Sequence, residues 1–403
     1  MKVLLAHNYY GSEAPSGENQ AFTAEADLLR SQGVEVFEFL RHSDEIRRQG
    51  LWGTLKGGLA TPWNFWSAGQ IKRRLNECRP DVVHAHNTFP LISPSIFRAI
   101  GHRAARVLTL HNYRLFCAAG IPMREGRVCT DCLGAGSVRP ALRHGCYRGS
   151  RVATVPLAMN VALHRWLGTW QKEVDAFIAL TQFQKDQLVA AGLPADKVHV
   201  KPNFYPGNPR VIPWDDRQPE AVFVGRLTPE KGLETLLTSW GDWARLENGN
   251  VPELCIVGDG PLRQRLEDMG KGLQVRFLGQ VSAEAAQARI ANARLLILPS
   301  LCFEGFPMVV REAFAFGTPA AVSNLGPLPG IVNDGQSGVV FEPGDAASLL
   351  SVVRTAWESP GLLARLGQGA RAEFEAKYTE QANFRTLMAI YRQAMAVSRA
   401  AQG

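Results

Sequence analysis

The chain has 403 residues, which at about 150 residues per domain predicts two to three domains. Hydrophobic residues make up 46% of the chain and charged residues 20%, a balance that excludes an intrinsically disordered protein, a collagen and a coiled coil. The net charge of +7 suits an acidic ligand, an anionic membrane surface or a nucleic acid, and does not choose among them.

No segment of the sequence reads as a membrane span or a signal peptide. The longest apolar candidate, residues 153–163, is shorter than the roughly 18 residues that cross a bilayer, and it contains Pro156 and Asn160. The N-terminal apolar run, residues 3–6, meets polar His7 too soon for a signal peptide. We therefore expect a cytoplasmic protein with reduced cysteines.

Strand and helix patterns alternate in the first half of the chain. A short apolar run at residues 3–6 is followed by a polar loop at 8–18, a helical pattern over 19–32 and an apolar run at 34–39. This alternation predicts a parallel sheet. Further strands of this sheet are predicted at residues 82–85, 107–110 and 177–180.

The same alternation restarts after a Pro-rich segment, within which we place a linker at residues 204–216. Later strands are predicted at residues 221–224, 254–257, 275–278 and 295–298, with a helix at 231–240. The sequence thus predicts an α/β fold of two doubly wound, Rossmann-like domains, residues 1–203 and 217–378, facing across a cleft. A final helix, residues 379–399, is expected to pack back on the first domain.

Two carboxylates accompany the predicted strand at 295–298. Glu304 lies in the loop after this strand, Pro307 suits the first turn of a helix, and Glu312 falls about one turn inside that helix. An ionised carboxylate accepts two hydroxyl hydrogen bonds and so can hold a sugar diol, whereas the helix start favours a phosphate. A capping or surface pair of glutamates is the alternative interpretation.

A matching element follows the strand at 221–224. Gly225 permits close approach of a ligand, Arg226 offers a fork of donors, and Lys231 adds a point charge. Together the two cations suit a diphosphate, whose negative charge must be stabilised as it leaves. Two solvated cations near a helix start are the alternative.

These segments together resemble the retaining glycosyltransferases of family 4, which have the GT-B fold and use a nucleotide-diphosphate sugar. The resemblance spans nearly the whole chain. It is most specific at residues 225–232, 258–261, 277–279, 299–319 and 334–345.

The resemblance implies a role for each matching residue. Glu304 would bind the donor hexose, Glu312 the ribose, and Arg226 and Lys231 the phosphates, while His111 would stabilise the transition state beside the sugar. The catalytic set is then His111, Arg226, Lys231 and Glu304. The donor-binding set is Gly17, Gly225, Arg226, Lys231, Gly305, Phe306, Pro307, Met308, Val309 and Glu312.

The resemblance also implies a metal-independent hexosyl transfer, in which the departing phosphate takes the proton of the acceptor hydroxyl on the same face of the sugar. The donor would be a UDP- or GDP-sugar, and the acceptor a saccharide or lipid-linked sugar in the assembly of a cell-surface polysaccharide or glycolipid. The family usually carries Glu where this chain has Gly330, so the contact made by that Glu is missing here.

Two histidines share one strand face: His84 lies in the strand predicted at 82–85, and His86 lies just after it. They are interpreted as packing and cleft-lining residues rather than metal ligands, because no Asp or Glu stands next to them in the sequence. His86 is a candidate acceptor contact.

Four cysteines, Cys117, Cys129, Cys132 and Cys146, fall within a Gly- and Arg-rich insertion at about residues 114–150. Because such a segment buries little core, a structural zinc held by the four thiolates would order it. Free thiols and disulfides remain the alternatives. The other cysteines, Cys78, Cys255 and Cys302, are predicted to be core thiols.

Basic and aromatic residues interleave in the first half, from Trp52 to Arg74 and from Arg139 to Trp170. This pattern suits a peripheral contact with the anionic inner face of a membrane. An ordinary solvated surface is the alternative, and no nucleic-acid-binding module is present.

Three rival functions are a non-catalytic basic protein that binds a membrane surface or nucleic acid, a glycosidase, and an NAD-dependent oxidoreductase, which the loop at 258–263 suggests. In that loop Arg263 stands where a dinucleotide fingerprint needs its third glycine.

Overall fold

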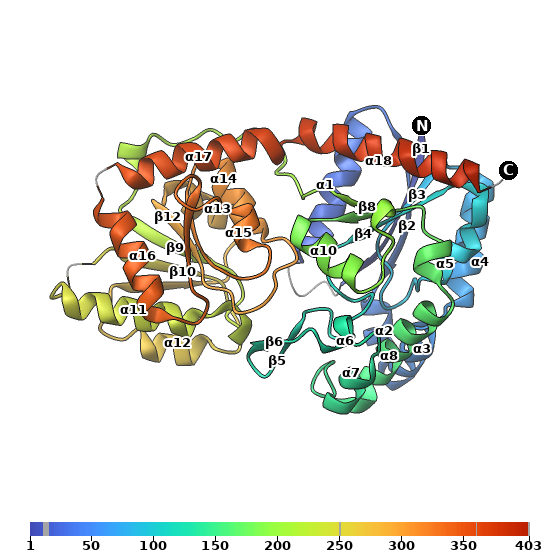
Figure 1. Ribbon diagram of the computed structural model, residues 1–403, viewed down its shortest axis with the longest axis horizontal. Coiled ribbons are helices and arrows are strands. Elements are labelled where there is room, and N and C mark those ends of the chain that lie inside the picture. Colours follow the sequence, from blue (N-terminus) through green and yellow to red (C-terminus); the bar gives the residue numbers. More distant parts are fainter. Residues whose placement is uncertain (11–15, 250, 360, 402–403) are drawn as a thin grey trace. The chain divides into compact units, whose positions relative to one another are not determined.

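The computed structural model describes residues 1–10, 16–249, 251–359 and 361–401 (Figure 1). Part of the polar loop predicted at 8–18 therefore lies outside the described residues. The chain forms two compact units. The first comprises residues 1–122, 130–203 and 383–403, and the second comprises residues 123–129 and 204–382. Each unit is built on one six-stranded sheet whose strands are all parallel, so the predicted α/β class with two Rossmann-like domains is confirmed.

The sheet of the first unit has the order β2-β1-β3-β4-β7-β8. Its strands are β1 (Lys2–Tyr9), β2 (Glu35–His42), β3 (Val82–Asn87), β4 (Ala105–Leu110), β7 (Ala176–Ala179) and β8 (Val198–Val200). β1, β3 and β4 are buried along nearly their whole length, as expected for central strands of a parallel sheet covered on both faces. The prediction missed β8, which has only three residues.

Helices α1 (Gly17–Ser31) and α18 (Glu380–Ala400) cover one face of this sheet (Figure 1). Phe22, Ala26 and Leu29 of α1 pack in one apolar cluster with Leu387 and Tyr391 of α18 and with residues of β1, β3, β4 and β7. The end of the chain thus completes the core of the first unit. The other helices of this unit are α2 (Asp44–Arg48), α3 (Gly50–Ala60), α4 (Phe65–Cys78), α5 (Ser95–Ile100), α6 (Asp131–Gly134), α7 (Arg139–His144), α8 (Arg151–Trp166), α9 (Thr169–Lys172) and α10 (Gln182–Ala190).

The insertion at about 114–150 is more ordered than its composition suggests. It contains α6, α7 and a hairpin of β5 (Met123–Arg124) and β6 (Arg127–Val128). Ala118, Cys132 and Ala141 form an apolar cluster with Leu157 of α8, and Val138 joins a second cluster on the same helix. The insertion thus buries apolar side chains together with α8, which supplies the apolar surface that the insertion lacks by itself.

The sheet of the second unit has the order β11-β10-β9-β12-β13-β14. Its strands are β9 (Glu220–Val224), β10 (Glu253–Val257), β11 (Val275–Gly279), β12 (Leu295–Leu298), β13 (Ala320–Ser323) and β14 (Gly338–Phe341). Numbered along the unit, this order is 3-2-1-4-5-6, the arrangement of dinucleotide-binding sheets. The prediction found the first four of these strands and missed β13 and β14.

The helices of the second unit are α11 (Leu233–Leu246), α12 (Arg263–Met269), α13 (Ala283–Asn292), α14 (Met308–Ala315), α15 (Leu328–Ile331), α16 (Ala346–Glu358) and α17 (Leu362–Lys377). Residues 204–216, the predicted linker, contain no strand and belong to this unit. Tyr205 N donates to Tyr378 O, and the Arg371 side chain bonds Pro209 O, so the segment is held by the end of the unit.

Candidate active site

The strand order of the second unit locates a candidate ligand site. Ligands of open parallel sheets bind at the carboxyl ends of the strands, where the strand order reverses. In this sheet the reversal lies between β9 and β12, which are direct neighbours. The loop after β9 carries Gly225, Arg226 and Lys231, and the loop after β12 carries Glu304 and leads to Pro307. The predicted donor-binding residues other than Gly17, which belongs to α1 of the first unit, are thus gathered at one edge of one sheet.

Glycines bring these loops into direct backbone contact. Gly232 has a φ of +69°, and a Cβ at this position would lie 1.9 Å from Pro299 O. The backbone N–H of Leu301 donates to Glu230 O at 2.8 Å. The helix predicted at 231–240 accordingly begins later, at Leu233, because Lys231 belongs to a 3-10 turn (Pro229–Lys231) that ends at Gly232.

The glycines of the loop at 258–263 also permit close backbone contact, here with the loop that follows β9. A Cβ on Gly258 would lie 1.8 Å from Gly225 O, and a Cβ on Gly260 would lie 2.5 Å from Leu227 O. This loop also follows β10, the second strand of the unit, whereas a dinucleotide fingerprint follows the first strand. The glycines thus serve loop packing, which removes the main support for an oxidoreductase.

Lys231 and Glu304 form an ion pair between the two loops. Lys231 Nζ lies 2.7 Å from Glu304 Oε1, and the Ser300 hydroxyl donates to the same oxygen. Both charged side chains are largely buried, with 17% and 12% of their surface exposed. The capping or surface interpretation of Glu304 and the solvated-cation interpretation of Lys231 do not fit this geometry.

The pKa values of the pair follow from this contact. Burial alone would lower the pKa of Lys231, but the charge and hydrogen bond of Glu304 outweigh it and raise the pKa. Burial likewise opposes the ionised form of Glu304, yet Lys231 and Ser300 hold its pKa below the ordinary value. The site therefore holds a charged ammonium next to a charged carboxylate.

Arg226 occupies a more open position in the same loop. Its side chain is 65% exposed and pairs with Glu230 Oε1 at 3.1 Å. The guanidinium lies close enough to Glu304 and Lys231 to act on the pKa of both. Arg226 can therefore reach a ligand at the mouth of the site while Lys231 lies deeper.

Residues 305–309 lead into α14, which starts at Met308 with no side-chain cap on Pro307. An uncapped helix start presents backbone N–H groups that suit an anion. Glu312 lies one turn into α14, where Arg311 donates to its Oε1 at 3.2 Å. Burial raises the pKa of Glu312, although Arg311 opposes the shift.

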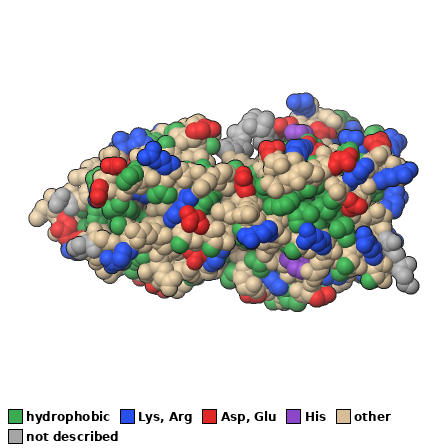
Figure 2. Space-filling view, turned by 90° about the horizontal axis from the view of Figure 1, so that it is seen from above, with side chains coloured by type: hydrophobic (Ala, Val, Ile, Leu, Met, Phe, Trp, Pro, Cys, Tyr) green, Lys and Arg blue, Asp and Glu red, His purple; other side chains and the backbone are tan. Residues whose placement is uncertain are grey.

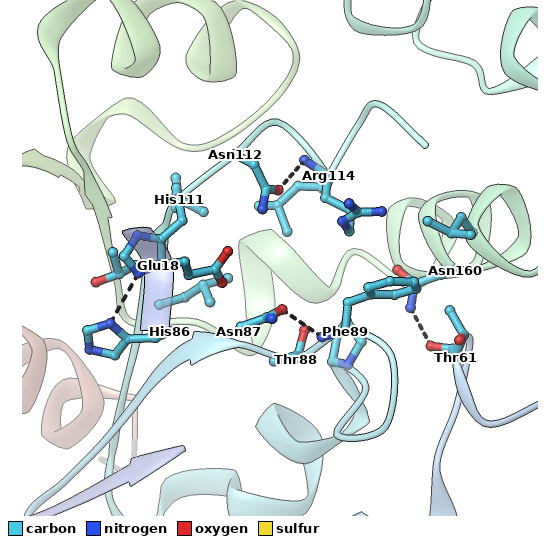
Figure 3. Close-up of a pocket in the computed structure, with 16 residues that line it drawn as sticks. Glu18, Thr61, His86, Asn87, Thr88, Phe89, His111, Asn112, Arg114 and Asn160 are labelled. Atoms are coloured by element: carbon cyan, nitrogen blue, oxygen red, sulfur yellow. Dashed lines mark hydrogen bonds between the residues drawn. The ribbon is translucent and has the colours of Figure 1, made fainter. Parts of the chain in front are cut away.

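The first unit contains a second candidate region, at the reversal of its own strand order between β1 and β3. Figure 3 shows the pocket there, with Glu18, His111, Asn112 and Arg114 around a common space and Asn160 of α8 at its far end. Ser16 caps α1 by accepting from Asn19 N, so Gly17 and Glu18 form the first turn of that helix. His111 directly follows β4.

Glu18 has an unusual environment. Burial raises its pKa to about 8, because the opposing charge of Arg114 and the hydrogen bond of Tyr10 do not offset the loss of water. The same burial raises the pKa of Tyr10. The sequence places Glu18 in a polar loop and gives no sign that Arg114 lies near it, since nothing in the sequence joins positions so far apart.

Behind His111 lies a buried network of charges and imidazoles. His86 Nδ1 lies 3.1 Å from His111 Nε2, and His86 Nε2 lies 3.1 Å from Glu25 Oε1. Lys201 Nζ donates to the other oxygen of Glu25 at 2.8 Å. Burial lowers the pKa of His111 well below its ordinary value, so its ring is neutral near pH 7.

No acidic residue adjoins His84 and His86 in the sequence, but in the structure α1 places Glu25 against both. The three side chains could in principle ligate a metal ion. However, His84 Nδ1 and Nε2 lie 2.8 Å from Tyr391 Oη and 2.7 Å from Thr109 Oγ1, and Lys201 places an ammonium on Glu25. The group therefore fits a packed charge network better than a metal site.

A zinc site at the four cysteines of the insertion stays a prediction. Among the described residues, which include all four, no three of their sulfur atoms lie within 4.8 Å of one another. Cys132 and Cys146 contribute instead to the apolar cluster on α8. Cys78, Cys255 and Cys302 are buried, which confirms the prediction of core thiols.

Gly330 lies on α15, and a Cβ at this position would meet no atom within 4 Å. The position therefore has room for a side chain.

The described residues also contain no helix with the length and hydropathy of a membrane span.

Comparison with known proteins agrees with this geometry. The model of "Glycosyl transferases group 1" matches residues 206–373, and the model of "Glycosyltransferase Family 4" matches residues 22–206. The sulfoquinovosyl transferase SQD2 of Arabidopsis thaliana is 30% identical over 383 residues, which cover 89% of this chain and 67% of that protein. The chain belongs to glycosyltransferase family 4, group 1.

Glycogen synthase of Mycobacterium tuberculosis is 28% identical over 309 residues, which cover 75% of this chain and 66% of that protein. The match thus spans slightly less than two thirds of that relative. Among solved structures, Anabaena Alr3699/HepE in complex with UDP-glucose shares the fold, with a TM-score of 0.62 at 18% identity over 97% of this chain and 99% of that one. The fold is GT-B.

Proposed function

We propose that this protein is a retaining hexosyltransferase that takes its sugar from a nucleotide-diphosphate donor without a metal ion. The observation that carries the proposal is the Lys231–Glu304 pair at the strand-order reversal of the second unit, next to the start of α14. A cation and an uncapped helix start suit a diphosphate, and a buried carboxylate suits sugar hydroxyls.

Each residue then has a distinct task. Lys231, Arg226 and the N–H groups at the start of α14 stabilise the negative charge that develops on the leaving diphosphate. Glu304 accepts hydrogen bonds from hydroxyls of the donor sugar. Glu312 accepts those of the ribose, with residues 305–309 and Gly225 forming the backbone of the site.

His111 and Gly17 of the first unit complete the proposal. The acceptor oxygen attacks the anomeric carbon on the face from which the diphosphate departs, and the acceptor proton passes to a phosphate oxygen. The neutral ring of His111 donates or accepts a hydrogen bond at the sugar and stabilises the transition state. The pocket around Glu18 and Arg114 is our candidate for the acceptor.

The donor class is supported by the UDP-glucose bound in Alr3699/HepE. We propose a UDP- or GDP-sugar, a saccharide or lipid-linked acceptor, and a role in the assembly of cell-surface polysaccharide or glycolipid. The protein would act in the cytoplasm at the inner face of the membrane, with no nucleic acid as partner. A structural zinc at Cys117, Cys129, Cys132 and Cys146 stays a prediction, which elemental analysis of protein purified without chelator would check.

A screen of nucleotide sugars tests the proposed function. We expect one UDP- or GDP-sugar to raise the melting temperature of the protein and to be hydrolysed slowly in EDTA. Glu312→Gln should need about ten-fold more nucleotide sugar for the same rise in melting temperature, because one charged hydrogen bond is lost. Glu358→Gln, which changes an exposed carboxylate on α16, is the matched control. The proposal would be contradicted if a nucleotide sugar stabilised Glu312→Gln and Glu358→Gln equally. It would also be contradicted if no nucleotide sugar stabilised the parent protein.

A further inference from the structure

Two neighbouring helices of the first unit carry large apolar side chains that face solvent. On α3 these are Trp52, Leu55 and Leu59, and on α8 they are Val152, Val155, Met159 and Trp166. The spacing of three and four residues places each set on one side of its helix. Phe65 and Trp66, at the start of α4, are exposed as well. We call these nine side chains, which are between 42% and 82% exposed, the apolar face.

Helices α3 and α8 are in contact, and Trp63 links Phe65 of α4 to α8, so the apolar face is one surface. A Cβ on Gly58 of α3 would lie 3.4 Å from the ring of Pro156 on α8. Asn160 of α8 donates to Thr61 O, just after α3, at 2.6 Å. Trp63, just before α4, stacks on His164 of α8 with ring centroids 5.8 Å apart. Figure 1 shows α3 and α8 side by side at the same edge of this unit.

The core of the unit does not use these side chains. The inner side of α8 is already filled by Leu157, Ala158 and Val161, which are buried in clusters with the insertion. The apolar face is therefore additional to the residues that stabilise the fold. A contiguous exposed apolar surface of this kind marks an interaction site.

Charge indicates which partner the apolar face fits. Residues 46–76 and 132–172, which supply α3, α8 and α4 up to the residue before Glu77, contain twelve Lys and Arg and no Asp or Glu. The rest of the chain has 32 Lys and Arg against 37 Asp and Glu, so the positive net charge arises entirely in these two segments. Elsewhere the signs are mixed, as on the face shown in Figure 2. Lys56, Arg148 and Arg151 are exposed within or beside the helices of the apolar face.

From this combination we propose that the apolar face inserts into the headgroup region of a bilayer that contains anionic lipid. Tryptophan and aliphatic side chains bury themselves at the interface of the acyl chains, and the surrounding cations bind acidic headgroups. The proposal deepens the membrane contact stated under the proposed function, and it rests on that function only for the membrane-bound acceptor. Vesicle binding is measured without any sugar, so failure of one proposal is distinguishable from failure of the other.

Co-sedimentation with vesicles tests the proposal. The full-length protein should bind vesicles of phosphatidylcholine mixed with phosphatidylglycerol, bind pure phosphatidylcholine much less, and lose binding as salt increases. Trp52→Ser with Trp166→Ser should lower binding at least about ten-fold. Lys56→Glu with Arg151→Glu should lower it at least about 25-fold, and only on the anionic vesicles, because each cation at such a surface contributes roughly five-fold.

Matched controls come from the second unit. Leu246→Ser removes an exposed apolar side chain and Arg210→Glu reverses an exposed charge, both outside the apolar face. Both controls should bind vesicles like the parent protein, and all variants should melt near its melting temperature. Equal loss in the controls, or no binding to anionic vesicles, would overturn the proposal. A further outcome would also overturn it: a parent protein that is a dimer and does not bind vesicles, together with a tryptophan variant that is a monomer. The apolar face would then bind a second copy of the chain.

Discussion

Lys231 Nζ lies 2.7 Å from Glu304 Oε1, and this ion pair links the loops that follow two neighbouring strands, β9 and β12. The two positions are 73 residues apart in the sequence. Each side chain is mostly buried, and the opposite charge of its partner offsets the free-energy cost of removing it from water. A change at either position therefore affects both the stability of the loops and the charge available to a donor phosphate.

The first prediction concerns this pair. Lys231→Ala should lower sugar transfer at least about 100-fold and lower the free energy of unfolding by about 1–3 kcal/mol, because it leaves a buried carboxylate without its partner. Steady-state kinetics and denaturant unfolding measure the two effects.

The double variant Lys231→Met with Glu304→Gln should recover stability without recovering activity, since no buried charge then remains unpaired. Recovery of activity in the double variant would show that the pair is structural only.

The second prediction concerns the glycine next to Lys231. Gly232→Ala should destabilise the second unit by about 1–3 kcal/mol more than Gly272→Ala and should weaken donor binding. Both glycines have positive φ angles, but only the Cβ at position 232 meets an obstacle, at 1.9 Å from Pro299 O. Melting temperatures of the two variants separate the steric effect from the backbone strain. Similar losses in the two variants would show that the loops do not need their close contact.

The third prediction concerns the orientation of His111. When His86 is neutral, its Nε2–H donates to Glu25 and its Nδ1 accepts from His111 Nε2–H, which leaves His111 Nδ1 without a proton. His86→Gln should lower kcat by about 10- to 100-fold, with little change in donor KM, because the misplaced ring fits the transition state less well.

Nitrogen NMR of the imidazoles gives the readout that a purely structural role would not move. The His111 tautomer should change in His86→Gln and stay the same in His199→Gln, a control on β8. Unchanged kcat with a changed tautomer would remove His86 from the mechanism.

The fourth prediction concerns pH and Glu18. Its pKa is raised in the folded protein from 4.5 to about 8, so the folded state binds a proton more tightly than the unfolded state. The stability that Glu18 contributes is fully present below about pH 4.5 and is lost as the pH rises through about 8. Glu18→Gln should therefore gain stability relative to the parent protein between pH 5 and 8.

Thermal unfolding across this range measures the difference, with Glu77→Gln as an exposed control in the first unit. A parent-to-variant difference that does not grow with pH would show that Glu18 is ionised in the pocket.

Much of the fold and of the second-unit site could be predicted from the sequence because the signals are local. Strands such as β12 are short apolar runs, and a loop that leads into a helix carries its own glycines, cations and carboxylates in order. Parallel-sheet topology then determines that consecutive βα loops meet at one edge. The short strands β8, β13 and β14 gave weaker patterns and were missed.

The rest was decided by contacts between residues far apart in the chain. Glu25 contacts His86 from another element, Lys201 pairs with Glu25, and α8 covers the insertion, whose composition alone predicts little burial. A sequence shows which residues carry charge or apolar surface, but burial sets the pKa of Glu18 and exposure creates the apolar face. Both quantities depend on which distant atoms exclude water from a side chain, and only the tertiary structure determines that.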